Sequence, residues 1–288
     1  METVIHQQLK TILPKQHGIS FSTVEGGYIN RSYCIESGPK KVFCKTNSAS
    51  KFPQLLRKEK NSLEFISKHG IIKTPGVIDH FEVAGYQVLM LEWINQGERT
   101  KSFWKKFGEQ LAALHLISNE HFGREEDNYM GSIPQNNQPA SNWIGFFVHQ
   151  RLEPLVTKCR EQMLLKKKHL SKFEKLYRII NNVYDHQEKP ALLHGDLWKG
   201  NFLCDDKSEP VLIDPSVYFG HRSIDLGMTT FYNSFDPQFY EAYKYHFPLP
   251  SNYKEQWEIS NLYALLISLL LFGKSLLPPI DLTLKRFT

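Results

Sequence analysis

The residues best suited to chemistry gather in one stretch of the chain, His194 to Asn201. Two short apolar segments follow, 202–204 and 211–213, separated by six polar or turn residues, and Asp214 comes directly after the second. An antiparallel hairpin places the residue before its first strand and the residue after its second strand at the same end. We therefore expect Asn201 and Asp214 to meet. Two such oxygen ligands suit Mg²⁺ and a phosphate ester.

The spacing Asp196-x-x-x-x-Asn201 resembles the catalytic loop of protein kinases. In that loop the Asp orients the substrate hydroxyl and accepts its proton, and the Asn binds metal. His194-Gly195-Asp196 then corresponds to the His-Arg-Asp triplet, and Asp214 to the start of Asp-Phe-Gly. Asp and Asn also cap ordinary turns, and for either residue alone that reading is the better one. The whole hairpin favours catalysis, because chance would have to supply several polar residues at a fixed register.

A kinase also needs a flexible glycine turn and a buried lysine held by a carboxylate. Gly26 and Gly27 lie between two expected strands, where glycine lets the backbone approach phosphates closely. Lys45 lies on the next strand, and Glu59 interrupts the apolar stripe of the helix that follows. Each of these residues alone has an ordinary reading as a hairpin turn, a surface lysine or a solvated charge. Together they predict a Lys45–Glu59 ion pair.

The rest of the chain predicts an α+β fold with two lobes. Residues 1–91 form the expected N-terminal nucleotide-binding lobe, 92–97 a hinge and 98–288 a helical C-terminal lobe with the catalytic loop and the substrate site. Alternating and apolar runs predict strands over 20–24, 28–36, 41–46, 77–82 and 87–91, with one helix over 52–68. Helical periodicity follows over 102–117, 143–159, 164–183, 236–245 and 255–272.

Composition narrows the functional class. The 288 residues carry 35 Lys and Arg against 30 Asp and Glu, a net charge of +5, which is too mild to indicate a nucleic-acid partner. The four cysteines form no CxxC pair, which favours a reducing compartment. The first residues lack a continuous apolar core, and the apolar run 262–273 is too short for a membrane span. We expect a cytoplasmic protein without a membrane partner, and a monomer is favoured.

Other chemistries find no support. The Gly273-Lys274-Ser275 segment lacks the glycine that a P-loop requires five positions earlier, because Ser268 is there. The sequence contains neither HExxH nor GxSxG. Its histidines are scattered, and a lone one such as His115 is better read as a satisfied core or surface residue than as a ligand.

The sequence resembles the fructosamine kinase (ketosamine-3-kinase) family over about 19–273. The most specific matches are the Gly-Asp-Leu-Trp loop at 195–198, with Trp198 where aminoglycoside and choline kinases usually carry His, and the Asn-Tyr-x-Gly-Ser-x-Pro-Gln stretch at 128–135. Further matches are Gly26-Gly27-Tyr28-Ile29-Asn30, the segments 107–115 and 122–123, Trp143, Phe146, Phe147, Arg151, Asp214-Pro215, Gly220-His221-Arg222 and Asp225-Leu226.

That resemblance implies a protein-kinase-like fold and transfer of the γ-phosphate of ATP to a hydroxyl of a small-molecule or protein-bound ketosamine, the 3-phosphate then initiating deglycation. It makes Asp196 the catalytic base. Trp198, next to the catalytic loop, is the candidate for an aromatic wall of the substrate site, and the alternative is an indole that simply packs between the lobes. Asn201 and Asp214 become Mg²⁺ ligands. The ATP site then comprises the Gly26-Gly27-Tyr28 turn, Lys45 held by Glu59, and the hinge residues Glu92, Trp93 and Ile94 against adenine. Asp225 becomes a buried brace of the catalytic loop.

Two departures from the family pattern matter. Tyr28 stands where many relatives have Cys, so no thiol switch is expected in the glycine turn. Ser268 and Leu270 stand where relatives usually carry His and Asn, and this difference leaves the identity of the acceptor substrate open. The alternatives are a kinase of another sugar, amino alcohol or aminoglycoside and, less favoured, a pseudokinase that binds nucleotide without turnover. The intact set of Lys45, Glu59, Asp196, Asn201 and Asp214 argues against the pseudokinase.

Overall fold

The computed structural model describes residues 18–27, 29–185 and 187–288. Tyr28, expected in the glycine turn, lies outside the described residues. The described chain forms two compact units, the first ending at Arg99 and including Leu203–Pro215, and the second comprising Thr100–Phe202 and Ser216–Thr288. The segment 203–215, expected within the C-terminal lobe, thus groups with the first unit.

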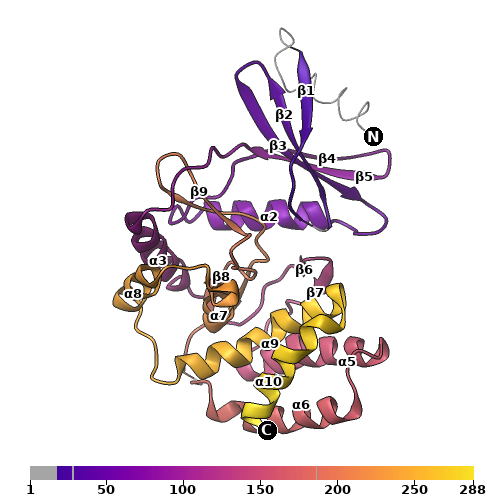
Figure 1. The fold of residues 1–288 in the computed structure, drawn as a ribbon, viewed down its shortest axis with the longest axis vertical. Helices are drawn as coiled ribbons and strands as arrows, with labels where there is room; N and C mark the ends of the chain where they lie inside the picture. The colour runs from indigo at the N-terminus through magenta and orange to yellow at the C-terminus, as the bar shows by residue number, and fades with distance from the viewer. Residues whose placement is uncertain (1–17, 28, 186) are drawn as a thin grey trace. The chain divides into compact units, whose positions relative to one another are not determined.

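The first unit is built on a five-stranded antiparallel sheet with strand order β1-β2-β3-β5-β4. The strands are β1 Ile19–Thr23, β2 Arg31–Ser37, β3 Lys40–Ser48, β4 Val77–Val83 and β5 Tyr86–Glu92, and helix α2 spans Leu55–Ser67. Helix α2 runs alongside the sheet, and its apolar stripe is buried (Figure 1). β3 and β5 lie in the interior of the sheet, and most of their residues are buried.

A two-stranded hairpin completes the first unit. β9 (Phe202–Cys204) begins at the unit boundary and pairs with β10 (Pro210–Leu212). The amide of Leu212 donates to the carbonyl of Lys73 at 2.8 Å, and the amide of Gly97 donates to the carbonyl of Cys204 at 2.9 Å. A Cβ at Gly97 would lie 2.3 Å from the carbonyl oxygen of Asp205, so only glycine permits this close approach. The hairpin is thereby fastened to the segment before β4 and to the segment that follows β5.

The second unit is mainly helical. Its helices are α3 Lys101–His115, α4 Trp143–Phe147, η1 Val148–Leu152, α5 Glu153–Glu161, α6 Lys167–Ile179, η2 Ile180–Asn182, α7 Ser223–Thr229, η3 Phe231–Asn233, α8 Pro237–His246, α9 Tyr253–Phe272, η4 Lys274–Leu276 and α10 Leu277–Phe287. α3 packs on α8 and α7 packs on α9 (Figure 1). Gly108 allows the first contact, since a Cβ there would lie 2.2 Å from the carbonyl oxygen of Phe239.

Two short antiparallel strand pairs connect these helices. β6 (Asn128–Met130) pairs with β7 (Ile133–Gln135), and β8 (Ala191–Leu193) pairs with β11 (Tyr218–Gly220). β8 leads directly into the catalytic loop, and all three of its residues are buried. The loop therefore starts from a rigid point in the interior of this unit.

The expected α+β class is confirmed, with an antiparallel sheet in the N-terminal part and a helical C-terminal part. Among the described residues, every helix falls short of the length and hydrophobicity that a membrane crossing demands. All four cysteines are free and buried.

Candidate active site

Lys45 lies within β3 and is only 4% exposed. Its Nζ donates to Oε1 of Glu59 at 2.7 Å. Glu59 belongs to the buried face of α2, between Leu55 and Leu63, so the periodicity that buries these leucines also carries the carboxylate inward. The predicted Lys45–Glu59 pair is therefore present in the structure.

The ammonium of Lys45 also forms an ion pair with Oδ1 of Asp214. Burial lowers the pKa of Lys45, but the carboxylates of Asp214 and Glu59 outweigh it and hold that pKa above its ordinary value. Burial raises the pKa of Glu59 to about 7, against the opposite pull of Lys45. Lys45 thus stays charged between two carboxylates. We call Lys45, Glu59 and Asp214 the lysine cluster.

The glycine turn is open. Gly26 and Gly27 have φ values of 119° and 87°, in a region that side chains rarely adopt, and a Cβ at either position would meet nothing within 4 Å. Both residues are exposed. Their backbone amides are accessible to a ligand.

The segment expected to face adenine is anchored to its neighbours in the first unit. Glu92 ends β5, and its Oε2 accepts a hydrogen bond from the amide of Gly76 at 3.1 Å. The ring of Trp93 lies 6.5 Å from that of Phe43, centroid to centroid, and Ile94 is buried. Glu92 therefore has a structural partner of its own.

The catalytic-loop residues Asp196 and Asn201 are joined in the second unit. Nδ2 of Asn201 donates to the carbonyl oxygen of Asp196 at 2.8 Å and to its Oδ2 at 2.9 Å. The amide of Asn201 also donates to the carbonyl of Trp198 at 2.9 Å, which closes the turn between them. The spacing of these two residues therefore brings their side chains together, with the Asp196 carboxylate half-buried.

Asp225 in α7 holds the start of this loop. Its Oδ2 accepts from the amide of His194 at 2.7 Å and its Oδ1 from the amide of Gly195 at 2.8 Å. Gly195 has φ 84°, and a Cβ there would lie 2.1 Å from the carbonyl oxygen of Ser216, so the loop can take this course only with glycine. The brace implied for Asp225 is confirmed.

Two further residues complete this brace, and the sequence did not reveal them. Nε2 of His115 lies 3.2 Å from Oδ2 of Asp225, and Nδ1 of His115 lies 2.8 Å from the hydroxyl of Tyr243. A carboxylate only accepts, so Nε2 carries the proton and the Tyr243 hydroxyl donates to Nδ1. We call Asp225, His115 and Tyr243 the loop brace. In the sequence, the only sign of the loop brace is that these polar side chains occur among apolar neighbours.

Trp198 is half-buried beside the loop. A Cβ on Gly200 would lie 2.6 Å from the indole, so the glycine makes room for the ring. The ring of Tyr232 lies 6.2 Å from that of Trp198, centroid to centroid. Sequence reasoning did not identify Tyr232, whose position in a short 3₁₀ turn left no periodic signal.

The oxygen donors fit Mg²⁺. Both protons of the Asn201 amide are used on Asp196, which leaves Oδ1 for a metal, while Asp214 binds Lys45 through Oδ1 and has Oδ2 left. In the part of the chain that the structure describes, no group of three or more His, Cys, Asp or Glu could hold a metal ion. Mg²⁺ fits such a sparse set because it takes most of its shell from water and phosphates. The expected meeting of Asn201 with Asp214 stays a prediction.

Comparison with known proteins identifies the family of the chain. The model of the fructosamine kinase family matches residues 1–287. The chain belongs to the fructosamine kinase family. It is 34% identical to the "Probable ketoamine kinase" of Synechocystis sp., over 87% of this chain and 84% of that protein. It is 33% identical to the "Probable ketoamine kinase" of Lactiplantibacillus plantarum, over 92% of both proteins.

Solved structures agree with this family assignment. A proposed fructosamine-3-kinase from Haemophilus somnus is similar with a TM-score of 0.85 and 26% identity, over 98% of this chain and 95% of that one. The aminoglycoside phosphotransferase APH(4)-Ia is similar with a TM-score of 0.65 at 15% identity, over 100% of both chains, which shows the shared protein-kinase-like fold alone. As a fructosamine kinase family member, the chain is an ATP-dependent phosphotransferase with an alcohol group as acceptor.

Proposed function

We propose that the protein transfers the γ-phosphate of ATP to O3 of a ketosamine, such as a fructosamine or ribulosamine, in an Mg²⁺-dependent reaction. The observation that carries this proposal is the Asp196–Asn201 pair on a loop fixed by Asp225. It is the arrangement that a hydroxyl acceptor requires, because the base must be held in a fixed direction while the attacking oxygen loses its proton.

Asp196 is the catalytic base in this proposal. Its carboxylate accepts the proton of the acceptor hydroxyl as the oxygen bonds to the γ-phosphorus and the bond to the ADP oxygen breaks. Asn201 orients that carboxylate through the bond from its Nδ2 to Oδ2. The proton leaves Asp196 for solvent after transfer.

Lys45 binds the phosphates of ATP and keeps its charge through Glu59. The open Gly26-Gly27 turn, which Tyr28 follows in the sequence, covers the phosphates with backbone amides. The segment Glu92-Trp93-Ile94 contacts adenine.

Asn201 and Asp214 hold Mg²⁺, which supplies charge neutralisation on the phosphate oxygens when bound. The asymmetry of the lysine cluster supports this role. The one ammonium of Lys45 contacts two carboxyl groups, Glu59 and Asp214, so the cluster has one acidic group in excess that a cation can balance.

Trp198 forms one wall of the acceptor site. Its half-buried indole lies three residues before Asn201 on the same loop, and a ring face suits both a sugar ring and a secondary ammonium. Ser268 and Leu270, half-buried on α9, replace the polar residues usual in the family and leave the preferred ketosamine to experiment. Phosphorylation at O3 makes such an adduct unstable, so the proposed role is to initiate deglycation.

The test measures ADP release from purified protein with ATP, Mg²⁺ and either a ribulosamine or a fructosamine. We expect release with at least one ketosamine, with the phosphate on O3 by phosphorus NMR. Asp196→Ala should lower turnover roughly 100-fold or more and leave ATP binding intact. Trp198→Ala should raise the KM for the ketosamine far more than the KM for ATP.

Metal binding has a matched control. Asp214→Asn should weaken Mg²⁺-dependent nucleotide binding, whereas Asp206→Asn in the hairpin turn should not. Equal Mg²⁺ titrations for the two variants would contradict the metal assignment. ADP release with an amino alcohol or an aminoglycoside but with neither ketosamine would replace the acceptor class, and nucleotide binding without turnover on any acceptor would indicate a pseudokinase.

A further inference from the structure

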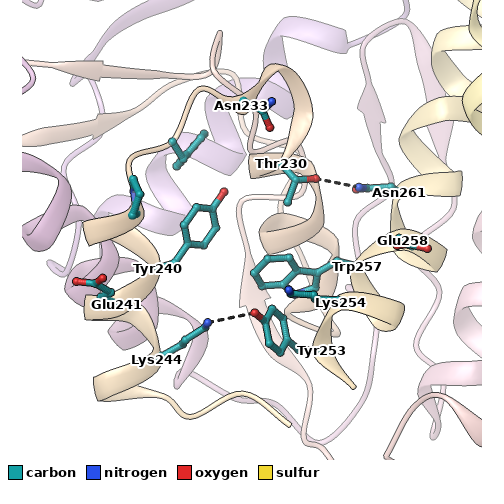
Figure 2. A pocket seen from close by; sticks show the side chains of 12 residues that line it. Thr230, Asn233, Tyr240, Glu241, Lys244, Tyr253, Lys254, Trp257, Glu258 and Asn261 are labelled. Atoms are coloured by element: carbon teal, nitrogen blue, oxygen red, sulfur yellow. Dashed lines mark hydrogen bonds between the residues drawn. The ribbon is translucent and has the colours of Figure 1, made fainter. Parts of the chain in front are cut away.

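A pocket of about 610 Å³ lies between α8 and α9 in the second unit (Figure 2). Its volume is within the range of pockets that hold small molecules. The residues that line it come from the end of α7, the η3 turn, α8 and the first half of α9. None of them is among the residues assigned above to phosphate transfer.

The walls of this pocket are aromatic. The rings of Tyr240 and Trp257 face each other from the two helices with centroids 5.8 Å apart, and Trp257 makes an edge contact with Tyr253 at 4.8 Å. Figure 2 shows these rings along the gap between α8 and α9. Aromatic faces of this kind bind aliphatic chains by excluding water from them.

Lys244 places a positive charge beside these rings. Its Nζ lies 3.2 Å from the hydroxyl of Tyr253 and 4.6 Å from the centre of that ring, and the side chain is half-buried. Within the described residues, no carboxylate forms an ion pair with Lys244 or with Lys254, which also lines the pocket. A half-buried ammonium without a carboxylate partner is suited to bind an anionic group of a ligand.

The acidic side chains of the lining do not cancel this charge. Glu258 is already paired with Arg286. Glu241 is exposed on α8, three residues before Lys244, and within the described residues the two side chains form no ion pair. A carboxylate of a ligand can therefore bind to the ammonium of Lys244. An ammonium of a ligand can bind to the carboxylate of Glu241.

The rim of the pocket connects to the catalytic-loop segment. Asn233 lines the pocket, and its neighbour Tyr232 touches the ring of Trp198. Tyr232 and Asn233 in η3 have left-handed backbones, with φ 64° and 47°, although neither is glycine. Nδ2 of Asn261 donates to Oγ1 of Thr230 at 3.3 Å, which ties the start of this turn to α9 (Figure 2). Such strain persists only where the surroundings hold it, and it concentrates at functional sites.

We propose that this pocket binds the amino-acid carrier of the ketosamine, with the free carboxylate of the carrier on Lys244 and its aliphatic chain against the rings of Tyr240 and Trp257. Tyr232 and Trp198 flank the sugar end. A lysine glycated on its side-chain amine has the sugar and the carboxylate at opposite ends of a flexible chain, which matches two linked sites. This inference rests on the proposed function.

The test compares three acceptors that share one ketose. They are the adduct of the lysine side chain, the same adduct with the carboxylate converted to a carboxamide, and the methylamine adduct. We expect the wild type to show a KM about tenfold lower for the lysine adduct than for its carboxamide, the effect of one charge-assisted contact. Lys244→Met should abolish this difference and leave the KM for ATP and for the methylamine adduct unchanged.

Lys158→Met, on the exposed face of α5, is the matched control and should keep the wild-type preference. Tyr232→Ala should raise the KM for all three adducts, whereas Tyr245→Ala, an exposed tyrosine of α8 outside the pocket lining, should not.

Equal KM values for the lysine adduct and its carboxamide in the wild type, unchanged by Lys244→Met, would overturn the assignment. Calorimetric titration of the lysine adduct without ATP separates this outcome from failure of the proposed function. If no adduct is phosphorylated, binding that weakens about tenfold in Lys244→Met still supports the pocket, and equal or absent binding rejects it.

Discussion

The lysine cluster and the loop brace each hold a group that the proposed mechanism uses, but they do so with different chemistry. In the first unit, Lys45 is held by two charged side chains, Glu59 and Asp214. In the second unit, the carboxylate of Asp225 accepts from two backbone amides and from His115, which is itself held by Tyr243. Every partner in the cluster is a side chain, whereas two partners in the brace belong to the backbone.

This difference predicts how each region responds to substitution. A buried pair of charged side chains can be replaced on both sides by apolar residues, often at no loss of stability. Backbone amides cannot be removed, so a loop brace without its acceptor leaves buried donors unpaired. In the proposed mechanism the cluster therefore serves phosphate binding more than folding, whereas the brace serves both the course of the catalytic loop and folding.

The largest effect is expected for Asp225→Ala. Loss of the acceptor leaves the amides of His194 and Gly195 unpaired, and unfolding should need about 3–5 kcal/mol less free energy, measured by urea titration. Turnover of the folded fraction should fall roughly 100-fold, because the catalytic loop loses its fixed course. Asp185→Ala, in an exposed turn, is the control. Turnover near the wild-type rate would show that the loop holds its course without the brace.

The next effect separates stability from activity in the lysine cluster. Lys45→Met leaves Glu59 buried without its cation and should cost about 3–5 kcal/mol of unfolding free energy. The double variant Lys45→Met with Glu59→Leu should recover most of that loss, yet both variants should turn over roughly 100-fold more slowly than the wild type. If the double variant regains turnover, Lys45 is not the phosphate ligand.

The brace should be sensitive to acid through His115. Burial lowers the pKa of His115 below its ordinary value near 6.5, despite the opposing effect of Asp225. As the pH falls below that ordinary value, His115 becomes protonated in the unfolded chain but stays neutral in the folded chain. The free energy of unfolding therefore decreases, and the stability due to neutral His115 is lost.

Replacement by glutamine tests this acid sensitivity. His115→Gln can donate to Asp225 and accept from Tyr243 without titrating, so its cost at pH 7.5 should be only about 1–2 kcal/mol. Its difference in melting temperature from the wild type should shrink toward pH 5. His149→Gln, at an exposed site, should leave the pH profile unchanged. A constant difference from pH 7.5 to pH 5 would contradict the assignment.

The smallest effect is expected at the outer end of the brace. Tyr243→Phe removes one neutral hydrogen bond to His115 and should lower the unfolding free energy by about 1 kcal/mol. Turnover should stay within about twofold, since the amide bonds to Asp225 remain. Tyr245→Phe, on the exposed face of the same helix, should change neither quantity, as thermal melts and initial rates can check.

Local pattern was enough for much of the fold and of the site. Alternation and turn residues placed the strands of the sheet within a few residues, and helical periodicity placed α2, α3, α8 and α9. The same periodicity oriented Glu59 inward. The spacing from Asp196 to Asn201 indicated a turn whose two ends meet, because a short closed turn leaves few alternative positions for its first and last residues.

Two α-helices, α7 and α10, were not predicted from the sequence, and in each case the reason is local. α7 is seven residues long and buried on all sides, so it has no polar face to mark a helical period. α10 opens with Leu277-Pro278-Pro279, which resembles a chain break, although proline is well tolerated in the first turn of a helix.

Other features were decided by the tertiary structure alone. The sequence supplied one partner for Lys45, and the fold added Asp214, 169 residues away. His115, Asp225 and Tyr243 come from three helices, and nothing in the spacing of α3, α7 and α8 predicts that their side chains meet. The reason is physical. A residue's own neighbours determine which face of a helix or strand it occupies, but only the packing of distant elements determines which polar group stands opposite it.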